Sequence, residues 1–301
     1  MIVILNHAAG APSQKKQSAD AQIRQLFAEH RAEVRILRPE GNTRLSALAE
    51  AAAADPHPVV VAGGGDGTIS AVAAALAGTG KALGILPLGT LNHFAKDLRI
   101  PLDLPAAVET VLQGRVAEVD VGEVNGRVFI NNSSLGIYPR IVASREAQQE
   151  QLARGKWPAF LWATLRAFRR FPFLNLRITT EGKQLVHKTA FIFIGNNEYQ
   201  ISGFNLGARA CLNAGKLGLY LTQRTGRFGL FRLAFHALLG RLQQAKDFNS
   251  FCVEEALIEA HQGRLLVATD GEVTWMKTPL RYRVRPAALR VLVSQPTKNA
   301  A

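Results

Sequence analysis

Short, uniformly apolar runs alternate with segments of helical spacing over roughly the first 115 residues, and this alternation constrains the fold most strongly. Because the runs are hydrophobic at successive positions rather than at every second one, they predict strands covered on both faces. Such strands in alternation with helices are typical of an open, mostly parallel sheet flanked by helices. The predicted strands are Ile2–Leu5, Val34–Leu37, Pro58–Ala62 and Leu83–Leu86, and the predicted helices are Ser18–His30, Leu45–Ala54, Ile69–Ala77 and Asn92–Leu98.

After about Val121 the pattern changes to strand-like runs separated by turn residues, which predicts a β-sandwich or barrel-like domain. A chain of 301 residues is long enough for two domains. We therefore expect an α/β domain over residues 1–124 and a β-rich domain over residues 125–296, whose last strand can return to the first domain. The strands predicted in the second domain are Val128–Asn131, Leu174–Thr180, Thr189–Gly195, Leu217–Thr222, Phe251–Ala260, Leu265–Thr269 and Leu280–Val284.

The stretch VVVAGGGDGTIS, residues 59–70, runs from a predicted strand through a glycine-rich turn into a predicted helix. Backbone N–H groups in such a turn bind phosphate. The stretch is not a Walker loop, and Thr68 stands where a dinucleotide-binding fingerprint has its last glycine. Asp66 adds a carboxylate that would repel an anion. The simpler alternative is that Asp66 or Thr68 only caps the helix.

A second turn, within PLGTLNHFAK at residues 87–96, again follows a strand and begins a helix, with Gly89 and Thr90 at the bend. The carboxyl ends of parallel strands meet at one edge of a sheet, where open α/β sheets bind their ligands. We therefore expect both turns, together with Asn6 after the first strand, to line one anion-binding crevice.

The combination of GGGDGT at residues 63–68, PLGTLNHFAKDL at residues 87–98 and DGE at residues 270–272 resembles the diacylglycerol kinase catalytic family. This group of lipid kinases includes bacterial diacylglycerol kinases and sphingosine kinases, and it shares the GGDGT loop with NAD kinases. The resemblance covers nearly the whole chain. It implies an NAD-kinase-like first domain, a β-sandwich second domain, and a lipid kinase that uses ATP and Mg²⁺ to phosphorylate diacylglycerol or a related lipid.

The resemblance also implies roles for individual residues. Asp66 would orient the ATP-bound Mg²⁺ or the phosphate loop, because a metal between carboxylate and phosphate turns repulsion into attraction. Asp270 would be the general base, and Glu272 would bind metal or position a neighbouring group. The residues alone favour a two-residue hairpin turn at Asp270-Gly271. The residues expected to bind the nucleotide are Asn6, Thr43, Gly64, Gly65, Gly67, Thr68, Gly89, Thr90 and Asn92.

The chain departs from the pattern of the family at several positions. His93 stands where an aspartate is usual, and Ala71 stands where an acidic residue is common. Residues 214–218 lack the carboxylates that hold a structural Mg²⁺ in some members, so we expect that metal site to be absent. The chain keeps Asp66 and Asp270, which favours an active enzyme.

Lysine and arginine number 36 against 23 aspartate and glutamate, and the net charge of +13 favours an anionic partner. The stretches Arg154–Phe173 and Arg227–Lys246 place aromatic residues at helical spacing beside arginines, which suits the surface of an anionic membrane. For each stretch, a core-facing stripe with a solvated basic face is the alternative. We expect a lipid substrate at the membrane surface and contact with anionic phospholipid headgroups. No nucleic-acid-reading motif accompanies the charge, so no nucleic acid is expected.

The amino-terminal apolar run has no basic segment before it and predicts a first strand rather than a signal peptide. No segment approaches the roughly 20 apolar residues of a spanning helix. Cys211 and Cys252 form no disulfide framework, which fits a reduced compartment. We expect a cytoplasmic protein that is peripherally associated with the membrane. The oligomeric state, a homodimer included, stays open. The alternative functions are an NAD-kinase-like enzyme and a catalytically weakened lipid- or nucleotide-binding regulator.

Overall fold

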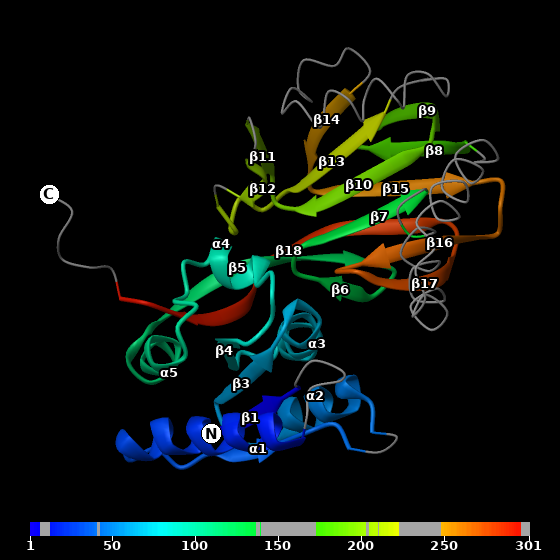
Figure 1. Ribbon diagram of the computed structural model, residues 1–301. Helices are drawn as coiled ribbons and strands as arrows, with labels where there is room; N and C mark the ends of the chain where they lie inside the picture. Colours follow the sequence, from blue (N-terminus) through cyan, green and yellow to red (C-terminus); the bar gives the residue numbers. More distant parts are fainter. Residues whose placement is uncertain are drawn as a thin grey trace, which may run out of the picture. The chain divides into compact units, whose positions relative to one another are not determined.

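The computed structural model describes residues 1–6, 13–40, 43–136, 139, 173–202, 205–209, 211–222 and 248–295 (Figure 1). The chain forms two compact units, Met1–Val121 with Arg285–Ala301, and Gly122–Val284. Of the two predicted basic helices, residues 154–172 and 227–246 lie outside the described residues. In the part of the chain that is described, no helix is long and apolar enough to span a membrane.

The first unit is built on a parallel sheet in the strand order β2-β1-β3-β4-β18. Its central strands β1, β3 and β4 are buried at nearly every position, which explains why their sequences are apolar throughout. The strands of this sheet are β1 (Ile2–Leu5), β2 (Arg35–Leu37), β3 (Val59–Gly64), β4 (Ala82–Pro87) and the carboxyl-terminal part of β18 (Leu280–Val293).

Five helices belong to the described part of the first unit, and one of them was not expected from the sequence. This helix, α5, begins after Asp103, whose carboxylate accepts the N–H of Ala106 at 3.2 Å and caps the first turn. It packs closely on β4, since a Cβ atom at Gly84 would lie 3.0 Å from the Val111 side chain. The helices are α1 (Ser13–Glu29), α2 (Leu45–Ala54), α3 (Asp66–Leu76), α4 (His93–Asp97) and α5 (Leu104–Gln113).

The second unit contains two larger antiparallel sheets, in the orders β14-β13-β10-β7-β16-β17 and β9-β8-β15-β18, and a separate two-stranded sheet of β11 and β12. The facing sides of the two larger sheets supply one apolar core, with Leu135, Ile192 and Leu219 from the first sheet and Leu176 and Ile258 from the second. The predicted fold class, an α/β unit with a parallel sheet and a β-sandwich unit, is therefore confirmed.

The remaining strands have the following bounds: β5 (Arg115–Val124), β6 (Arg127–Phe129), β7 (Asn132–Gly136), β8 (Leu174–Thr180), β9 (Lys183–Thr189), β10 (Phe191–Asn196), β11 (Tyr199–Ser202), β12 (Asn205–Arg209), β13 (Leu217–Thr222), β14 (Phe248–Val253), β15 (Glu255–Ala260), β16 (Arg264–Thr269) and β17 (Glu272–Lys277).

Two predicted strands are wrong because each is divided in the structure. The segment Phe251–Ala260 contributes its first part to β14 and its second part to β15, in different sheets. The two adjacent exposed glutamates at 254 and 255 break the alternation there. The segment Val128–Asn131 is divided between the end of β6 and residues before β7, where the N–H groups of Ile130 and Asn131 bind a side chain instead of a neighbouring strand.

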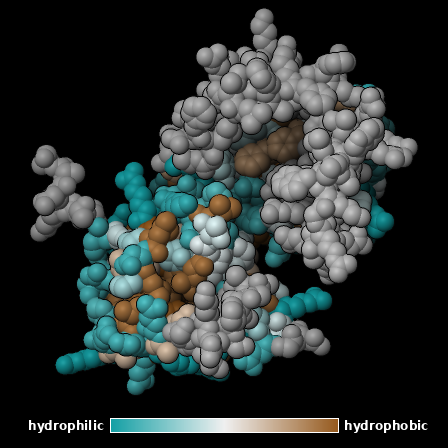
Figure 2. Space-filling model, in the orientation of Figure 1, coloured by the Kyte–Doolittle hydropathy of each residue, from teal (hydrophilic) through white to brown (hydrophobic). Residues whose placement is uncertain are grey.

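The face of the molecule in Figure 2 carries hydrophobic side chains, coloured brown, among hydrophilic ones, as is ordinary for protein surfaces. Two exposed leucines, Leu88 and Leu91, belong to the second glycine turn, and Trp275 of β17 is also exposed.

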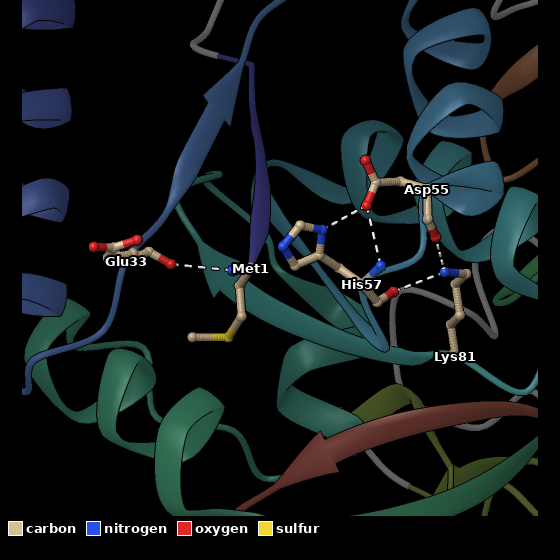
Figure 3. Close-up of polar contacts among 5 residues, drawn as sticks. All are labelled: Met1, Glu33, Asp55, His57 and Lys81. Carbon is tan, nitrogen blue, oxygen red and sulfur yellow. Dashed lines mark hydrogen bonds and ion pairs between the residues drawn. The ribbon is translucent and has the colours of Figure 1, made fainter.

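Polar contacts at the amino-terminal ends of β3 and β4 hold the loop that follows α2 (Figure 3). The ammonium group of Lys81 donates to the carbonyl oxygens of Asp55 and His57. The backbone N–H of His57 donates to Asp55 Oδ1 at 3.0 Å, and His57 Nδ1 lies 2.5 Å from the same oxygen. Because the glycine turns follow the carboxyl ends of the same strands, this group of contacts is a structural feature away from them.

Replacing Asp55 by asparagine is expected to lower the urea midpoint of unfolding slightly at pH 7. Hydrogen bonds from the side chain and then the backbone of His57 lower the pKa of Asp55 below its ordinary value. A depressed carboxyl pKa stabilises the fold above the unfolded value of about 3.9, and this contribution is lost as the pH falls through the lower folded pKa. Urea titrations at pH 7 and pH 2 should give a larger difference at pH 7 than at pH 2. A difference that is equal at both pH values, or an equal effect of Glu109→Gln at an exposed position of α5, would contradict this account.

Candidate functional site

The first glycine turn joins β3 to α3 and is held by the end of β1. The N–H groups of Thr68 and Ile69 donate to the Gly65 carbonyl at 2.9 and 3.1 Å, which begins the helix. Asn6 Nδ2 donates to the buried hydroxyl of Thr68 at 3.2 Å. A Cβ atom at Gly64 would lie 2.5 Å from that hydroxyl, so the packing requires glycine there. The structure thus brings together Asn6, Gly64 and Thr68.

The second glycine turn joins β4 to α4, and Asn92 holds its shape. Asn92 is 5% exposed and adopts the left-handed conformation with φ 50°. Its Oδ1 accepts the N–H of Gly89 at 3.0 Å, while its Nδ2 donates to the Gly89 carbonyl at 2.8 Å. Asn92 is therefore a structural residue of the turn, since its amide satisfies both polar groups of Gly89.

The two turns touch each other through a pair of glycines. The N–H of Leu88 donates to the Gly64 carbonyl at 3.0 Å. A Cβ atom built on Gly89 would lie 2.5 Å from the Gly65 Cα atom and 2.8 Å from Asn92 Oδ1. Close approach of the two backbones therefore depends on glycine at position 89, and it joins both turns into one edge of the sheet.

Replacing Gly89 by alanine is expected to destabilise the first unit by about 1–3 kcal/mol, because the added methyl group forces the two turns apart. Gly67 is the matched control, since no atom lies within 4 Å of a Cβ atom built there. Gly67→Ala in the first turn of α3 should leave the midpoint of chemical unfolding unchanged or raise it. Equal midpoints for Gly89→Ala and the parent protein would show that the glycine contact is not required.

Asp66 is the first residue of α3, and its Oδ1 atom is buried without a hydrogen-bond partner in the described part of the chain. The residue that caps α3 is Gly65, with no side-chain capping bond. The alternative in which Asp66 or Thr68 caps the helix is therefore not what the structure contains. A buried carboxylate oxygen without a donor is costly, and a cation at this position would compensate it.

The donor set at Asp66 fits Mg²⁺ that arrives with a nucleotide. Among the described residues there is no group of three or more His, Cys, Asp or Glu side chains that could hold a metal ion. Mg²⁺ in kinase sites is commonly bound through one or two carboxylates, with substrate phosphates and water supplying the other ligands. A single carboxylate at the edge formed by the two turns meets that requirement.

Three other residues expected to bind the nucleotide lie on the surface. Gly67 and Thr90 are exposed beside the first and second turns, with open space in front of Gly67. Thr43 is exposed before α2, and its N–H donates to the Glu40 carbonyl at 3.0 Å. His93 is exposed at the start of α4. The side chains of Thr43, Thr90 and His93 therefore face solvent rather than the packed interior.

In the second unit, Asp270 and Gly271 form the two-residue turn between β16 and β17. Thr269 pairs with Glu272, and both turn residues have positive φ values, 48° and 88°. This geometry is that of a type I′ hairpin, as the residues alone had indicated. The hairpin reading does not exclude a chemical role, because the Asp270 side chain points back toward the chain before β7.

The carboxylate of Asp270 accepts three backbone hydrogen bonds from consecutive residues. Its Oδ2 atom accepts the N–H of Ile130 at 2.8 Å. Its Oδ1 atom accepts the N–H groups of Asn131 and Asn132 at 2.8 and 3.0 Å. In return the N–H of Asp270 donates to the Asn132 carbonyl at 2.8 Å. The carboxylate is therefore held in one orientation by rigid groups.

Glu272 is exposed and forms an ion pair with Arg127, which also donates to the Thr274 hydroxyl at 2.7 Å. The structure thus brings Glu272 to Arg127 on the surface of the β16–β17 hairpin. An exposed pair of this kind contributes little to stability.

Sequence reasoning missed a polar cluster beside Asp270, formed by the buried residues Asn131, Asn196 and Arg209 and the half-buried Tyr199. Arg209 donates to the Ile130 carbonyl at 2.7 Å and to Asn131 Oδ1 at 2.9 Å. A signal was present, because the doublets Asn131-Asn132 and Asn196-Asn197 follow apolar runs in which polar amides are unexpected.

The departure from the family pattern at Gly218 has a packing reason. A Cβ atom at Gly218 would lie 2.9 Å from the ring of Tyr220, which occupies the adjacent space. The Tyr220 hydroxyl accepts the N–H of Tyr199 at 2.8 Å and donates to the Tyr199 carbonyl. Burial raises the pKa of Tyr220 to about 12, so this hydroxyl stays protonated near neutrality.

A parallel α/β unit with paired glycine turns and a β-sandwich unit together define the fold class of diacylglycerol kinases and NAD kinases. A putative diacylglycerol kinase from Bacillus anthracis str. Sterne has this fold, with a TM-score of 0.72, 23% identity and 97% of each chain covered. Yeast NADH kinase in complex with NADH aligns with a TM-score of 0.54 and 13% identity over 99% of this chain and 84% of that chain.

Sequence comparison identifies the family. Residues 1–124 match the diacylglycerol kinase catalytic domain, and residues 138–293 match the YegS C-terminal NAD kinase beta sandwich-like domain. A probable lipid kinase YegS-like protein of Pseudomonas aeruginosa is 31% identical over 287 residues, which is 92% of this chain and 91% of that protein. A diacylglycerol kinase of Staphylococcus aureus is 25% identical over 228 residues, 74% of this chain and 70% of that protein. The chain belongs to the diacylglycerol kinase catalytic-domain family, as the sequence motifs predicted.

Proposed function

We propose that the protein is an ATP-dependent lipid kinase that transfers the γ-phosphoryl group to a hydroxyl of diacylglycerol or a related lipid. The observation that carries this proposal is the buried, unpartnered Oδ1 atom of Asp66 at the edge formed by two glycine turns. Membership of the family and relatives named as lipid and diacylglycerol kinases support the same assignment.

On the nucleotide side, the proposal assigns binding to backbone groups and positioning to side chains. The backbone of Gly64, Gly65 and Gly67 approaches the phosphates, and the exposed Thr90 hydroxyl is available to them. Asn6 and Thr68 instead hold the first turn in shape through their mutual hydrogen bond. Asp66 would hold the Mg²⁺ of the nucleotide, and such an ion would supply neutralisation of the phosphate charge.

On the acceptor side, Asp270 is proposed as the general base. As the acceptor hydroxyl attacks the γ-phosphorus, its oxygen forms the new P–O bond and the bond to ADP breaks. The proton of the hydroxyl passes to the Asp270 carboxylate. Three backbone N–H groups keep that carboxylate in one orientation, which is the preorganisation that a proton acceptor needs.

We infer that the protein works at an anionic membrane surface. Trp275 is 56% exposed, and the Arg264 guanidinium lies 5.1 Å from the centre of its ring. Lys277 is opposite Arg264 in the β16–β17 register, so both cations and the indole lie on one face of the hairpin. A tryptophan flanked by cations suits the headgroup region of an anionic membrane, and the net charge of +13 supports this partner.

Replacing Trp275 by alanine is expected to weaken binding to phosphatidylglycerol-containing vesicles by roughly three- to tenfold, from the loss of buried apolar area. Val186→Ala is the control, because Val186 is an exposed apolar residue of β9. Vesicle co-sedimentation measures both variants. Equal binding of Trp275→Ala and the parent protein would remove the hairpin from the membrane contact.

The proposed activity is tested by transfer of radiolabelled γ-phosphate from ATP, with Mg²⁺, to a total bacterial lipid extract and separately to NAD. Label in a lipid that disappears with Asp270→Asn would establish the lipid kinase, and mass analysis would name the acceptor. Label in NAD would assign the chain to the NAD kinases instead. ATP binding without transfer to either acceptor would favour the catalytically weakened regulator.

A further inference from the structure

The backbone of residues 130–132 lies between two charged side chains of the second unit. Asp270 binds the N–H groups of this segment, as described above. The groups that bind its carbonyl oxygens come from Arg209, Asn196 and Tyr199, residues that are remote from Asp270 in the sequence. The segment is therefore bound at both ends of its peptide dipoles.

A single peptide unit connects Arg209 with Asp270. The carbonyl oxygen of Ile130 accepts a hydrogen bond from Arg209 Nη1 at 2.7 Å, and another from Asn196 Nδ2 at 3.0 Å. The N–H of the same peptide unit belongs to Asn131 and donates to Asp270 Oδ1 at 2.8 Å. The guanidinium and the carboxylate thus bind opposite ends of one peptide dipole.

The next peptide unit repeats this arrangement with neutral donors. The carbonyl oxygen of Asn131 accepts hydrogen bonds from the Tyr199 hydroxyl at 3.1 Å and from the Asn196 N–H at 2.8 Å. Its N–H, which belongs to Asn132, donates to the same Asp270 Oδ1 atom at 3.0 Å. Two consecutive dipoles therefore have their positive ends on the Asp270 carboxylate.

Burial and several further contacts hold the Arg209 guanidinium beside residues 130–132. It is 6% exposed, and its guanidinium lies 5.4 Å from the centre of the Tyr199 ring. Its Nη2 atom donates to Asn131 Oδ1 at 2.9 Å, and Nη1 also lies 3.1 Å from the Asn196 carbonyl oxygen. A buried cation is costly unless its donors are paired, and two of the three hydrogen bonds named here go to the segment that binds Asp270.

We propose that Arg209 is a positioning residue for Asp270, whose carboxylate it orients through the peptide unit of Ile130 and Asn131. Hydrogen bonds in series polarise one another, and a charged donor on a carbonyl strengthens the hydrogen bond made by the N–H of the same unit. This inference rests on the proposed role of Asp270 as the base. Arg209, which lies outside the sequence motifs, then affects the rate of proton transfer and not the binding of the nucleotide.

The experiment compares Arg209→Met and Arg209→Lys with the parent protein in γ-phosphate transfer to lipid, after the parent protein has been found active. The expected result is a fall in kcat of about 10- to 100-fold for Arg209→Met, as for other residues that orient a functional group through an intervening hydrogen-bonded group. The KM for ATP should stay within about twofold, and Arg209→Lys, which keeps a charged donor, should recover part of the loss. The matched control is Arg177→Gln, because Arg177 is an exposed arginine of β8 that faces Glu259.

A double-mutant cycle distinguishes positioning from a general loss of structure. Adding Arg209→Met to Asp270→Asn should reduce kcat little further, because the group that Arg209 orients is already gone. A kcat of Arg209→Met within twofold of the parent, or equal losses in the presence and absence of the Asp270 carboxylate, would overturn the inference. If Arg209→Met does not fold, Tyr199→Phe removes one donor from the second peptide unit and should still lower kcat severalfold without changing the KM for ATP.

A second measurement is independent of catalysis. The shifts in urea midpoint caused by Arg209→Met and Asp270→Asn should sum to more than the shift of the double variant, because the two charges are coupled. If the parent protein transfers no phosphate, the proposed function fails while this coupling can still be observed. Additive midpoint shifts in an active parent protein would overturn the positioning role and leave the proposed function intact.

Discussion

Replacement of Asp270 by asparagine is expected to lower kcat for phosphoryl transfer by about 10²–10⁴-fold, the usual contribution of a general base. The amide that replaces the carboxylate cannot accept the proton of the acceptor hydroxyl. The KM for ATP should change little, because the residues proposed to bind the nucleotide are those of the glycine turns, which this substitution leaves unchanged. Steady-state kinetics with labelled ATP and a lipid acceptor measure both quantities.

Asp270→Asn is also expected to destabilise the protein by about 1–3 kcal/mol. In the parent protein the Ile130 N–H donates to Asp270 Oδ2, and in the variant an amide nitrogen, which cannot accept this hydrogen bond, would take the place of that oxygen. The control is Gly271→Ala, which strains the same hairpin at a φ of 88° and keeps the carboxylate. This strain costs about 1–2 kcal/mol. Gly271→Ala should retain most of its activity at a temperature where both variants are folded. Comparable loss of activity in Asp270→Asn and Gly271→Ala would mean that activity depends on the conformation of the hairpin and not on the Asp270 carboxylate as a base.

Replacement of Asp66 by alanine is expected to lower activity without lowering stability, whereas Asp270→Asn is expected to lower both. Because Asp66 Oδ1 is buried without a hydrogen-bond partner among the described residues, its removal costs no such bond. The urea midpoint without Mg²⁺ should therefore stay the same or rise. The catalytic efficiency with Mg-ATP should fall by about 10²–10³-fold, as expected for loss of electrostatic preorganisation.

Activity and unfolding measured across a Mg²⁺ titration test this prediction. The Mg²⁺ concentration that gives half-maximal activity should increase in Asp66→Ala. The control Glu50→Ala removes an exposed carboxylate of α2 and should leave both the rate and the Mg²⁺ dependence unchanged. A large loss of stability in Asp66→Ala that matches its loss of activity would indicate a structural carboxylate instead.

The sequence by itself determined the architecture of the first unit, because the signals for it are local. Uniformly apolar runs predicted β1, β3 and β4, and the structure buries these strands on both faces. Glycine-rich turns after two neighbouring parallel strands predicted that both turns lie at one edge, and Gly65 and Gly89 do meet there. The helix α5 was missed although its start has a local signal, an aspartate cap followed by proline.

Only the tertiary structure decided how the second unit assembles the surroundings of Asp270. The sequence allowed a hairpin turn or a catalytic carboxylate at this position, and the structure contains the hairpin with its side chain bound to residues 130–132. The partners are about 140 positions apart in the chain, and Arg209 binds Asn131 across 78 positions. Contacts of this kind leave no periodic pattern in the sequence. Buried polar groups take whichever partners the packed sheets bring to them, because burial without a partner is too costly.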